Sequence, residues 1–206
     1  MSQITLSGNA SGTGVFTIAS PNSNSNYTQT LPAATGTLYI PGTTVSNIQS
    51  GTAVASTSGT SIDFTSIPSW VKRITVMFGG VSTSGTSNII ARIGSGSIDS
   101  TSTYTGAGSY VGGTNNCGAT QNTTSFILVG TSTTIAASTY CGALTFTTLG
   151  SNIWCLTGTL SSTSSTIYNH VSSGNKTLSG TLDRVSITTV NGTDTFDAGT
   201  INIFYE

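Results

Sequence analysis

Charged side chains are scarce in this 206-residue sequence, which has five Lys and Arg, six Asp and Glu, and one His. A protein that binds nucleic acids needs a basic surface to displace counterions from phosphates, and five basic residues do not supply one. Intrinsic disorder combines low hydrophobicity with high charge, whereas charged residues make up only 5% of this chain. Most soluble enzymes are also richer in charge, since about a quarter of an ordinary domain is charged. These absences exclude nucleic-acid binding and argue against disorder and against a typical enzyme.

Long apolar runs and clusters of metal ligands are missing too. No window approaches the ~20 consecutive apolar residues of a membrane-spanning helix, so we expect no membrane insertion. The first residues, MSQITLSGNASG, lack the basic and apolar regions of a secretory signal, which predicts assembly in a cytoplasm. Cys117, Cys141 and Cys155 show no C-x-x-C spacing, and the lone His170 adds too little for a zinc site. We expect free thiols, with a pair within the chain or a bridge between subunits as alternatives, and no metal or cofactor.

Hydroxyl-bearing residues and glycine dominate what is present. The sequence has 33 Ser, 41 Thr and 25 Gly, together 99 of 206 residues. Apolar residues alternate with polar ones in several short segments, at 70–78, 89–93, 144–146, 154–160, 185–189 and 201–205. The run Phe126–Val129 is apolar throughout, as in a strand covered on both faces. No stretch keeps a helical period, so the sequence predicts an all-β chain with a β-sandwich or jelly-roll-like domain.

The chain changes character near residue 51. Residues 1–62 contain no charged side chain and three of the four prolines. We therefore predict a β-rich attachment or stem segment over 1–50 and a β-sandwich head domain over 51–206. Charges at sheet edges normally prevent strands of different molecules from pairing, and here they are few. This predicts an obligate homo-oligomer in which copies share their strand edges.

Two segments resemble tail fibres of tailed bacteriophages. The first is Ile4–Leu38, ITLSGNASGTGVFTIASPNSNSNYTQTLPAATGTL, in which SPN, LP and the closing ATGTL carry most of the likeness. The second, SIDFTSIPSWVKRITVMFGGVSTSGTS from Ser61, is similar to C-terminal head domains of such fibres, particularly in phages of aquatic bacteria. The resemblance implies a homotrimer on the virion, although the N-terminal anchoring domain usual in the family is missing from this sequence.

The resemblance implies a structural virion protein, a trimeric tail fibre whose distal β-domain adheres to a host receptor, expected to be a glycan. The N-terminal segment would then bind another tail or baseplate protein through Phe16, Ile18, Pro21, Pro32, Leu38 and Tyr39. Several weak sites on each particle would give strong adhesion by avidity. Two alternatives remain open: a capsid head-fibre or decoration protein, and a small tail-associated glycan depolymerase.

Candidate contact residues fall in two places. The segment Gly94–Ser125 is predicted to be a long loop, and it carries the aromatic and amide side chains that bind sugars: Tyr104, Tyr110, Asn115, Asn116, Gln121 and Asn122. Tyr168 and His170 form a second candidate contact. The alternative for the loop is packing against a neighbouring subunit.

Nothing in the sequence places a catalytic nucleophile or a pair of catalytic acids. No G-x-S-x-G elbow is present to place a serine beside His170, and a lone His is usually packed or solvated. Asp194 and Asp197 lie in NGTDTFDAG, which favours a turn held by Asn and Asp hydrogen bonds over a calcium loop. We therefore expect no enzymatic activity.

Overall fold

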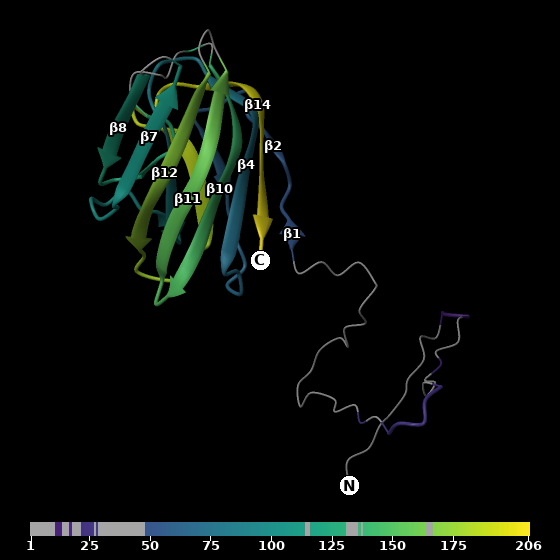
Figure 1. The fold of residues 1–206 in the computed structure, drawn as a ribbon. Helices are drawn as coiled ribbons and strands as arrows, with labels where there is room; N and C mark the ends of the chain where they lie inside the picture. The colour runs from purple at the N-terminus through teal and green to yellow at the C-terminus, as the bar shows by residue number, and fades with distance from the viewer. Residues whose placement is uncertain are drawn as a thin grey trace. The chain divides into compact units, whose positions relative to one another are not determined.

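The computed structural model describes residues 11–13, 17, 22–26, 28, 48–113, 116–130, 136, 138–163 and 167–206. The chain divides into two units, Met1–Thr43 and Thr44–Glu206, and every described strand belongs to the second (Figure 1). The six residues predicted for virion attachment all lie outside the described residues: Phe16, Ile18, Pro21, Pro32, Leu38 and Tyr39. The predicted contact residue Asn115 also lies outside them.

The described residues of the second unit form fourteen strands and no helix, which confirms the all-β prediction. The strands are β1 (Gln49–Ser50), β2 (Val54–Ala55), β3 (Ser61–Phe64), β4 (Arg73–Thr83), β5 (Ile89–Ser95), β6 (Ser97–Ile98), β7 (Gly106–Gly112), β8 (Asn116–Asn122), β9 (Phe126–Ile127), β10 (Thr139–Gly150), β11 (Ile153–Thr163), β12 (Tyr168–Thr177), β13 (Arg184–Thr189) and β14 (Phe196–Tyr205).

The strands form two antiparallel sheets that pack as a β-sandwich. The nine-stranded sheet has the order β1-β14-β4-β10-β11-β12-β7-β8, with β2 also on β14, and the five-stranded sheet has the order β3-β13-β5-β6, with β9 also on β5. The pairs β2–β14, β3–β13, β4–β10 and β5–β9 are those of a jelly roll, whose strands alternate between two four-stranded sheets. The sandwich prediction is therefore confirmed.

Two insertions widen the jelly roll on one side. β6, β7 and β8 lie between β5 and β9 in the sequence, and β11 and β12 lie between β10 and β13. Strands β11, β12, β7 and β8 extend the large sheet beyond β10 (Figure 1). We call these four strands the added half, and the eight paired strands above the jelly-roll half.

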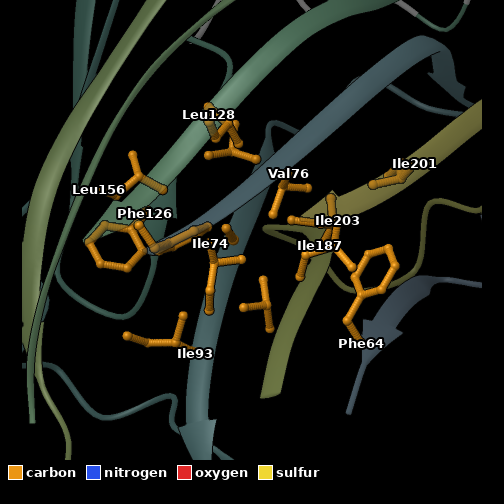
Figure 2. Close-up of a cluster of buried hydrophobic side chains, with 14 of the residues drawn as sticks. Phe64, Ile74, Val76, Ile93, Phe126, Leu128, Leu156, Ile187, Ile201 and Ile203 are labelled. Atoms are coloured by element: carbon orange, nitrogen blue, oxygen red, sulfur yellow. The ribbon is translucent and has the colours of Figure 1, made fainter. Parts of the chain in front are cut away.

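Alternation along the strands places the core between the sheets. On β4, Ile74, Val76 and Phe78 are buried, whereas Thr75 and Met77 on the opposite face are partly exposed. Figure 2 shows residues from both sheets meeting in this core, among them Val76 of β4 and Ile187 of β13. The period-two reading of these segments is thus correct, because one face of each strand is removed from water.

Three details of the sequence-based prediction were wrong. The alternating segment predicted at 70–78 begins too early, because β4 starts only at Arg73 and Trp70 is 46% exposed. The reason is a turn at Pro68, whose carbonyl accepts a hydrogen bond from the Val71 amide (3.1 Å). The run Phe126–Val129 is buried throughout, but only its first two residues form a strand, β9.

The segment Gly94–Ser125 was predicted to be a long loop and instead contains β6, β7 and β8. In this segment glycine occupies inward-facing positions where a neighbouring group lies close to the backbone. The alternation of apolar and polar side chains that identifies a strand is therefore missing. A Cβ on Gly108 would lie 2.7 Å from Ile127, and one on Gly118 would lie 2.6 Å from the ring of Tyr110. Glycine inside a strand commonly marks such a close approach.

Candidate functional site

One end of the sandwich has three shallow depressions. The first, about 370 Å³, is lined by Ser69, Val71, Lys72, Thr148, Leu149, Gly150, Ser151, Asn152, Trp154, Thr181 and Leu182. The second, about 220 Å³, is lined by Ser95, Ser97, Ile98, Asp99, Ser100, Thr101, Leu178 and Ser179. The third, about 370 Å³, is lined by Tyr104, Thr105, Gly106, Ala107, Gln121, Asn122 and Thr123. Side chains with hydroxyl groups occur in all three linings, and amide side chains occur in the first and the third.

The depressions follow one another because the end of β12 lies between them. The amide of Leu178, beside the second depression, donates to the carbonyl of Asn152 in the first (3.0 Å). The amide of Thr105, in the third, donates to the carbonyl of Asn175 on β12 (3.0 Å). All three depressions therefore lie around the end of β12, and we call this region the polar end.

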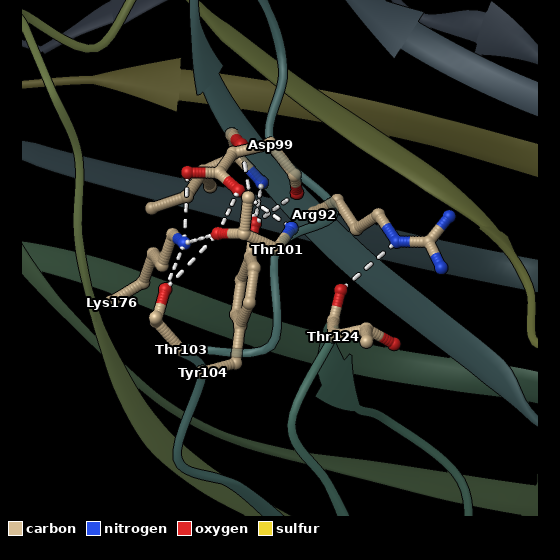
Figure 3. A network of polar contacts seen from close by, with 8 residues as sticks. Arg92, Asp99, Thr101, Thr103, Tyr104, Thr124 and Lys176 are labelled. Atoms are coloured by element: carbon tan, nitrogen blue, oxygen red, sulfur yellow. Dashed lines mark hydrogen bonds and ion pairs between the residues drawn. The ribbon is translucent and has the colours of Figure 1, made fainter.

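A buried lysine supports the polar end from within. Lys176 of β12 is 1% exposed, and its Nζ lies 2.8 Å from Asp99 Oδ2 (Figure 3). The ammonium also donates to the hydroxyls of Thr101 (2.7 Å) and Thr103 and lies 4.6 Å from the centre of the Tyr104 ring. Since each proton of the ammonium has an acceptor, the cost of burying the charge is offset. These contacts of Lys176 hold residues 99–104 of one insertion against β12 of the other.

This arrangement shifts two pKa values. Burial alone raises the pKa of the Asp99 carboxyl, but hydrogen bonds from Lys176 and Thr101 outweigh it and hold that pKa below its usual range. Burial raises the pKa of Tyr104 to about 12. The Tyr104 hydroxyl donates to the Asp99 carbonyl (2.8 Å) and accepts from the Ile93 amide (3.1 Å). Asp99 and Tyr104 thus remain in one protonation state over the physiological range.

Sequence reasoning missed Lys176 as a functional or structural centre. The signal that was available is its isolation, because it is the only charged residue between Asp99 and Asp183. A lone lysine within an uncharged strand pattern indicates a specific partner.

Three of the predicted contact residues come together in the third depression. Gln121 is exposed, Asn122 is partly exposed, and Tyr104 is buried with its ring edge-on to Phe126 (centres 5.0 Å apart, planes at 82°). The Asn122 Oδ1 accepts from the amide (2.7 Å) and hydroxyl (2.9 Å) of Thr124. Gln121 therefore offers the freest amide of this set to a ligand.

Four other predicted contact residues meet near the opposite end of β12. His170 lies opposite Tyr110 because β12 pairs with β7, and the Asn116 amide donates to the Tyr168 hydroxyl (2.9 Å). The rings of Tyr110 and Tyr168 pack edge-on with centres 5.7 Å apart. Tyr110 and His170 are buried, Tyr168 is partly buried and Asn116 is exposed. This group serves mainly as packing for the added half.

His170 is held as a neutral imidazole. Its Nδ1 accepts from the Gly130 amide (3.4 Å), so the proton is on Nε2, which donates to the Ser162 hydroxyl (3.1 Å). Burial lowers the pKa of His170 to about 4. A serine and a histidine are thus in contact, but both are fully buried and removed from any substrate.

The carboxylates take part in holding the fold. Each acidic side chain is bonded to another group: Asp63 to Ser61, Asp99 to Lys176, Asp183 to Arg184, Asp194 to Asn191, Asp197 to Ser82 and Glu206 to Arg73. The turn predicted at NGTDTFDAG is confirmed, since Asn191 Oδ1 accepts from the amides of Thr193 (3.1 Å) and Asp194 (3.2 Å). Within the described ranges, no three His, Cys, Asp or Glu side chains cluster as metal ligands.

Over the same part of the chain, no helix is long and apolar enough to cross a membrane. The three cysteines are free thiols, with Cys117 and Cys141 exposed and Cys155 partly exposed.

No protein-family model, no curated protein and no solved structure matches this chain.

Proposed function

We propose that the chain is a structural adhesion protein of a tailed bacteriophage, a trimeric tail fibre whose β-sandwich binds a glycan on the host-cell surface. The resemblance of Ile4–Leu38 and of the stretch from Ser61 to fibre segments supports this placement on the virion. In this proposal the N-terminal segment attaches the sandwich to another tail or baseplate protein. A β-sandwich head fits the proposal, because rigid sheets present their loops and edges as binding surfaces.

The observation that carries the proposal is the row of three depressions at the polar end. Their linings combine hydroxyls, the amides of Asn152 and Gln121, and the nearly buried rings of Trp154 and Tyr104. Neutral sugars are bound through such hydroxyl and amide groups. A row of sites accommodates successive residues of a polysaccharide, and three copies in one fibre multiply weak contacts into firm adhesion.

The state of the carboxylates supports adhesion over glycan cleavage. A glycosidase needs two carboxyl groups that flank the scissile bond, one of which has a raised pKa so that it acts as an acid. Here the hydrogen bonds from Arg184 lower the pKa of Asp183, and the pKa of Asp99 is also lowered. These two groups remain ionised and engaged in ion pairs.

The test is binding of the full chain to a panel of bacterial surface polysaccharides, with Gln121→Ala as the site variant. We expect Gln121→Ala to weaken binding about fivefold at each site, since one hydrogen bond contributes about 1 kcal/mol. The matched control is Gln49→Ala, which removes an exposed amide on β1 outside the three depressions. Binding should change little with salt, because few charges are involved. Release of reducing sugars from a bound polysaccharide would contradict the proposal and favour a depolymerase.

A further inference from the structure

The two solvent-facing sides of the sandwich differ in charge. The outer side of the small sheet carries Asp63 on β3, Arg92 on β5 and Arg184 on β13, none of them buried. By contrast, strands β7, β8, β10 and β11 contain no charged residue, and the only one on β12 is the buried Lys176. The solvent-facing side of β7, β8, β10, β11 and β12 therefore carries no charged side chain.

That surface is made of every second residue of five neighbouring strands. It runs over Thr139–Thr147 of β10, Cys155–Thr163 of β11, Asn169–Thr177 of β12, Ser109–Val111 of β7 and Cys117–Ala119 of β8, and we call it the outer face. Its residues are Ser, Thr, Ala, Cys, Val and Asn, and none of them is buried. On β7 and β8 the outer face ends before the pair Ala107 and Gln121, which borders the third depression, and on β10, β11 and β12 it extends to the edge of the polar end.

A sheet face of this composition is unusual as a solvent surface. Monomeric sheets carry Lys, Glu and other charges on their exposed faces and edges, which prevent association with other sheets. On the outer face Val111 is 63% exposed and Val171 is 45% exposed, and the side chains around them are short. Short, uncharged side chains allow a second surface to approach as closely as stacked sheets do, about 10 Å between backbones.

We infer that the outer face is buried against other copies of this chain. Hydroxyl groups both donate and accept hydrogen bonds, so a surface of Ser and Thr complements itself, whereas a charged partner would find no opposite charge there. At about 4.8 Å between strands and about 3.3 Å per residue, nine residues on each of three strands and three residues on each of the other two cover about 500 Å². This is more than half of the about 800 Å² that each partner contributes to a stable interface. Copies of the same face also meet without like-charge repulsion.

The inference does not depend on glycan binding. It assigns a surface to the self-association that the proposed function requires, and the residues of that surface are different from those that line the three depressions. A variant of the outer face therefore tests assembly, whereas Gln121→Ala tests recognition. Failure of one proposal does not contradict the other. Self-association through the outer face is measured as solution mass and thiol reactivity, whereas glycan recognition is measured as sugar binding by the assembled protein.

The experiment uses the full chain and compares Thr159→Lys with Thr193→Lys. Thr159 lies within the outer face on β11, opposite Val171, and Thr193 is exposed in the turn between β13 and β14. We expect the unmodified chain and Thr193→Lys to have a solution mass that is a multiple of 20.8 kDa. Thr159→Lys should have the mass of one chain, since a buried unpaired charge is strongly unfavourable.

The thiols give a second measurement that needs no variant. Cys117, Cys141 and Cys155 belong to the outer face, so in the assembled protein they should react with a maleimide at least tenfold more slowly than in the unfolded chain. An unmodified chain that is monomeric in solution would overturn the inference. An oligomer whose mass survives Thr159→Lys and whose three thiols react as fast as those of the unfolded chain would also overturn it, because its copies would then meet elsewhere.

Discussion

The jelly-roll half and the added half of the large sheet are built from different interiors. Between the sheets of the jelly-roll half, most buried side chains are apolar, as with Ile74, Phe146 and Ile203. In the added half, β11 also buries apolar side chains, but β12 buries the polar His170 and Lys176. The first half is stabilised mainly by removal of apolar surface from water, whereas the second also depends on hydrogen bonds and an ion pair.

The polar contacts of the added half join the two insertions to each other. Neither insertion has enough apolar residues to form a core alone, and each leaves polar backbone to be satisfied. Lys176 of one insertion binds Asp99 of the other, and the β12–β7 pairing aligns His170 with Tyr110. Polar contacts require defined geometry, so they fix the position of the polar end more strictly than apolar packing would. We expect the two halves to respond differently to substitution.

The largest loss should come from the jelly-roll half. Phe146 on β10 is fully buried, and Phe146→Ala should lower the free energy of unfolding by about 4 kcal/mol, since it removes apolar contacts and leaves a cavity. Denaturant unfolding followed by fluorescence measures the change. The matched control is Phe204→Ala on β14, which is partly exposed and should cost much less. Equal losses for the two variants would contradict the assignment of the core.

Removal of the buried charge should affect the added half selectively. Lys176→Met leaves Asp99 without its cation and should cost about 3 kcal/mol. Hydrogen exchange should show loss of protection in residues 97–122 and 168–177, while β4, β13 and β14 keep theirs. The double variant Lys176→Met with Asp99→Asn should recover part of the loss. Uniform loss of protection over both halves would show that they unfold as one unit.

Acid should weaken the added half through His170. Its pKa is about 4 in the folded protein and about 6.5 when unfolded, so the folded state favours the neutral ring. The stabilisation is complete above pH ~6.5 and falls as the pH drops towards ~4, because only the unfolded chain then binds the proton. The full loss is about 3 kcal/mol. Unfolding experiments across this range should show the slope, and His170→Gln should remove it.

The smallest effect concerns the hairpin that joins the two halves. Strands β10 and β11 are connected by Ser151 (φ 50°) and Asn152 (φ 60°), the left-handed pair of a type I′ turn, which favours Asn-Gly. Replacing both residues, Ser151→Asn with Asn152→Gly, should raise the free energy of unfolding by about 0.5 to 1 kcal/mol. Thermal unfolding gives the change. A decrease would mean that the side chains of this turn contribute contacts of their own.

The alternating strands of the jelly-roll half, together with β11 of the added half, were predictable from sequence, whereas β12, β7 and β8 were not. The alternation around Ile74, Val76 and Phe78 identifies a strand because apolar burial leaves a period of two. In β7 and β8, glycine replaces the inward side chains where Tyr110 and Ile127 press on the backbone, so no period remains to be read. The contact residues predicted within Gly94–Ser125 separate into two places in the structure, and this separation depends on strand register.

Burial was the second property that the sequence did not reveal. Tyr110 and His170 have polar groups and lie in polar segments, which made them candidates for ligand contact. In the structure they are interior residues whose partners come from elements distant in sequence, such as Gly130 and Ser162 for His170. Only the pairing of β12 with β7 and β11 brings these groups together.

The position of β14 has a consequence for synthesis. This strand, Phe196–Tyr205, lies in the sheet between the earliest strands, β1 and β2, and β4. While residues 151–195 are being translated, the edge of β4 that β14 will cover stays open, and the jelly roll cannot close. Folding must therefore follow translation of Tyr205, and contacts of such long sequence separation form slowly. A chain with so few charges is exposed to misassembly during this delay. A stop codon shortly before Phe196 would leave nearly the whole sequence translated and none of it able to complete the sandwich.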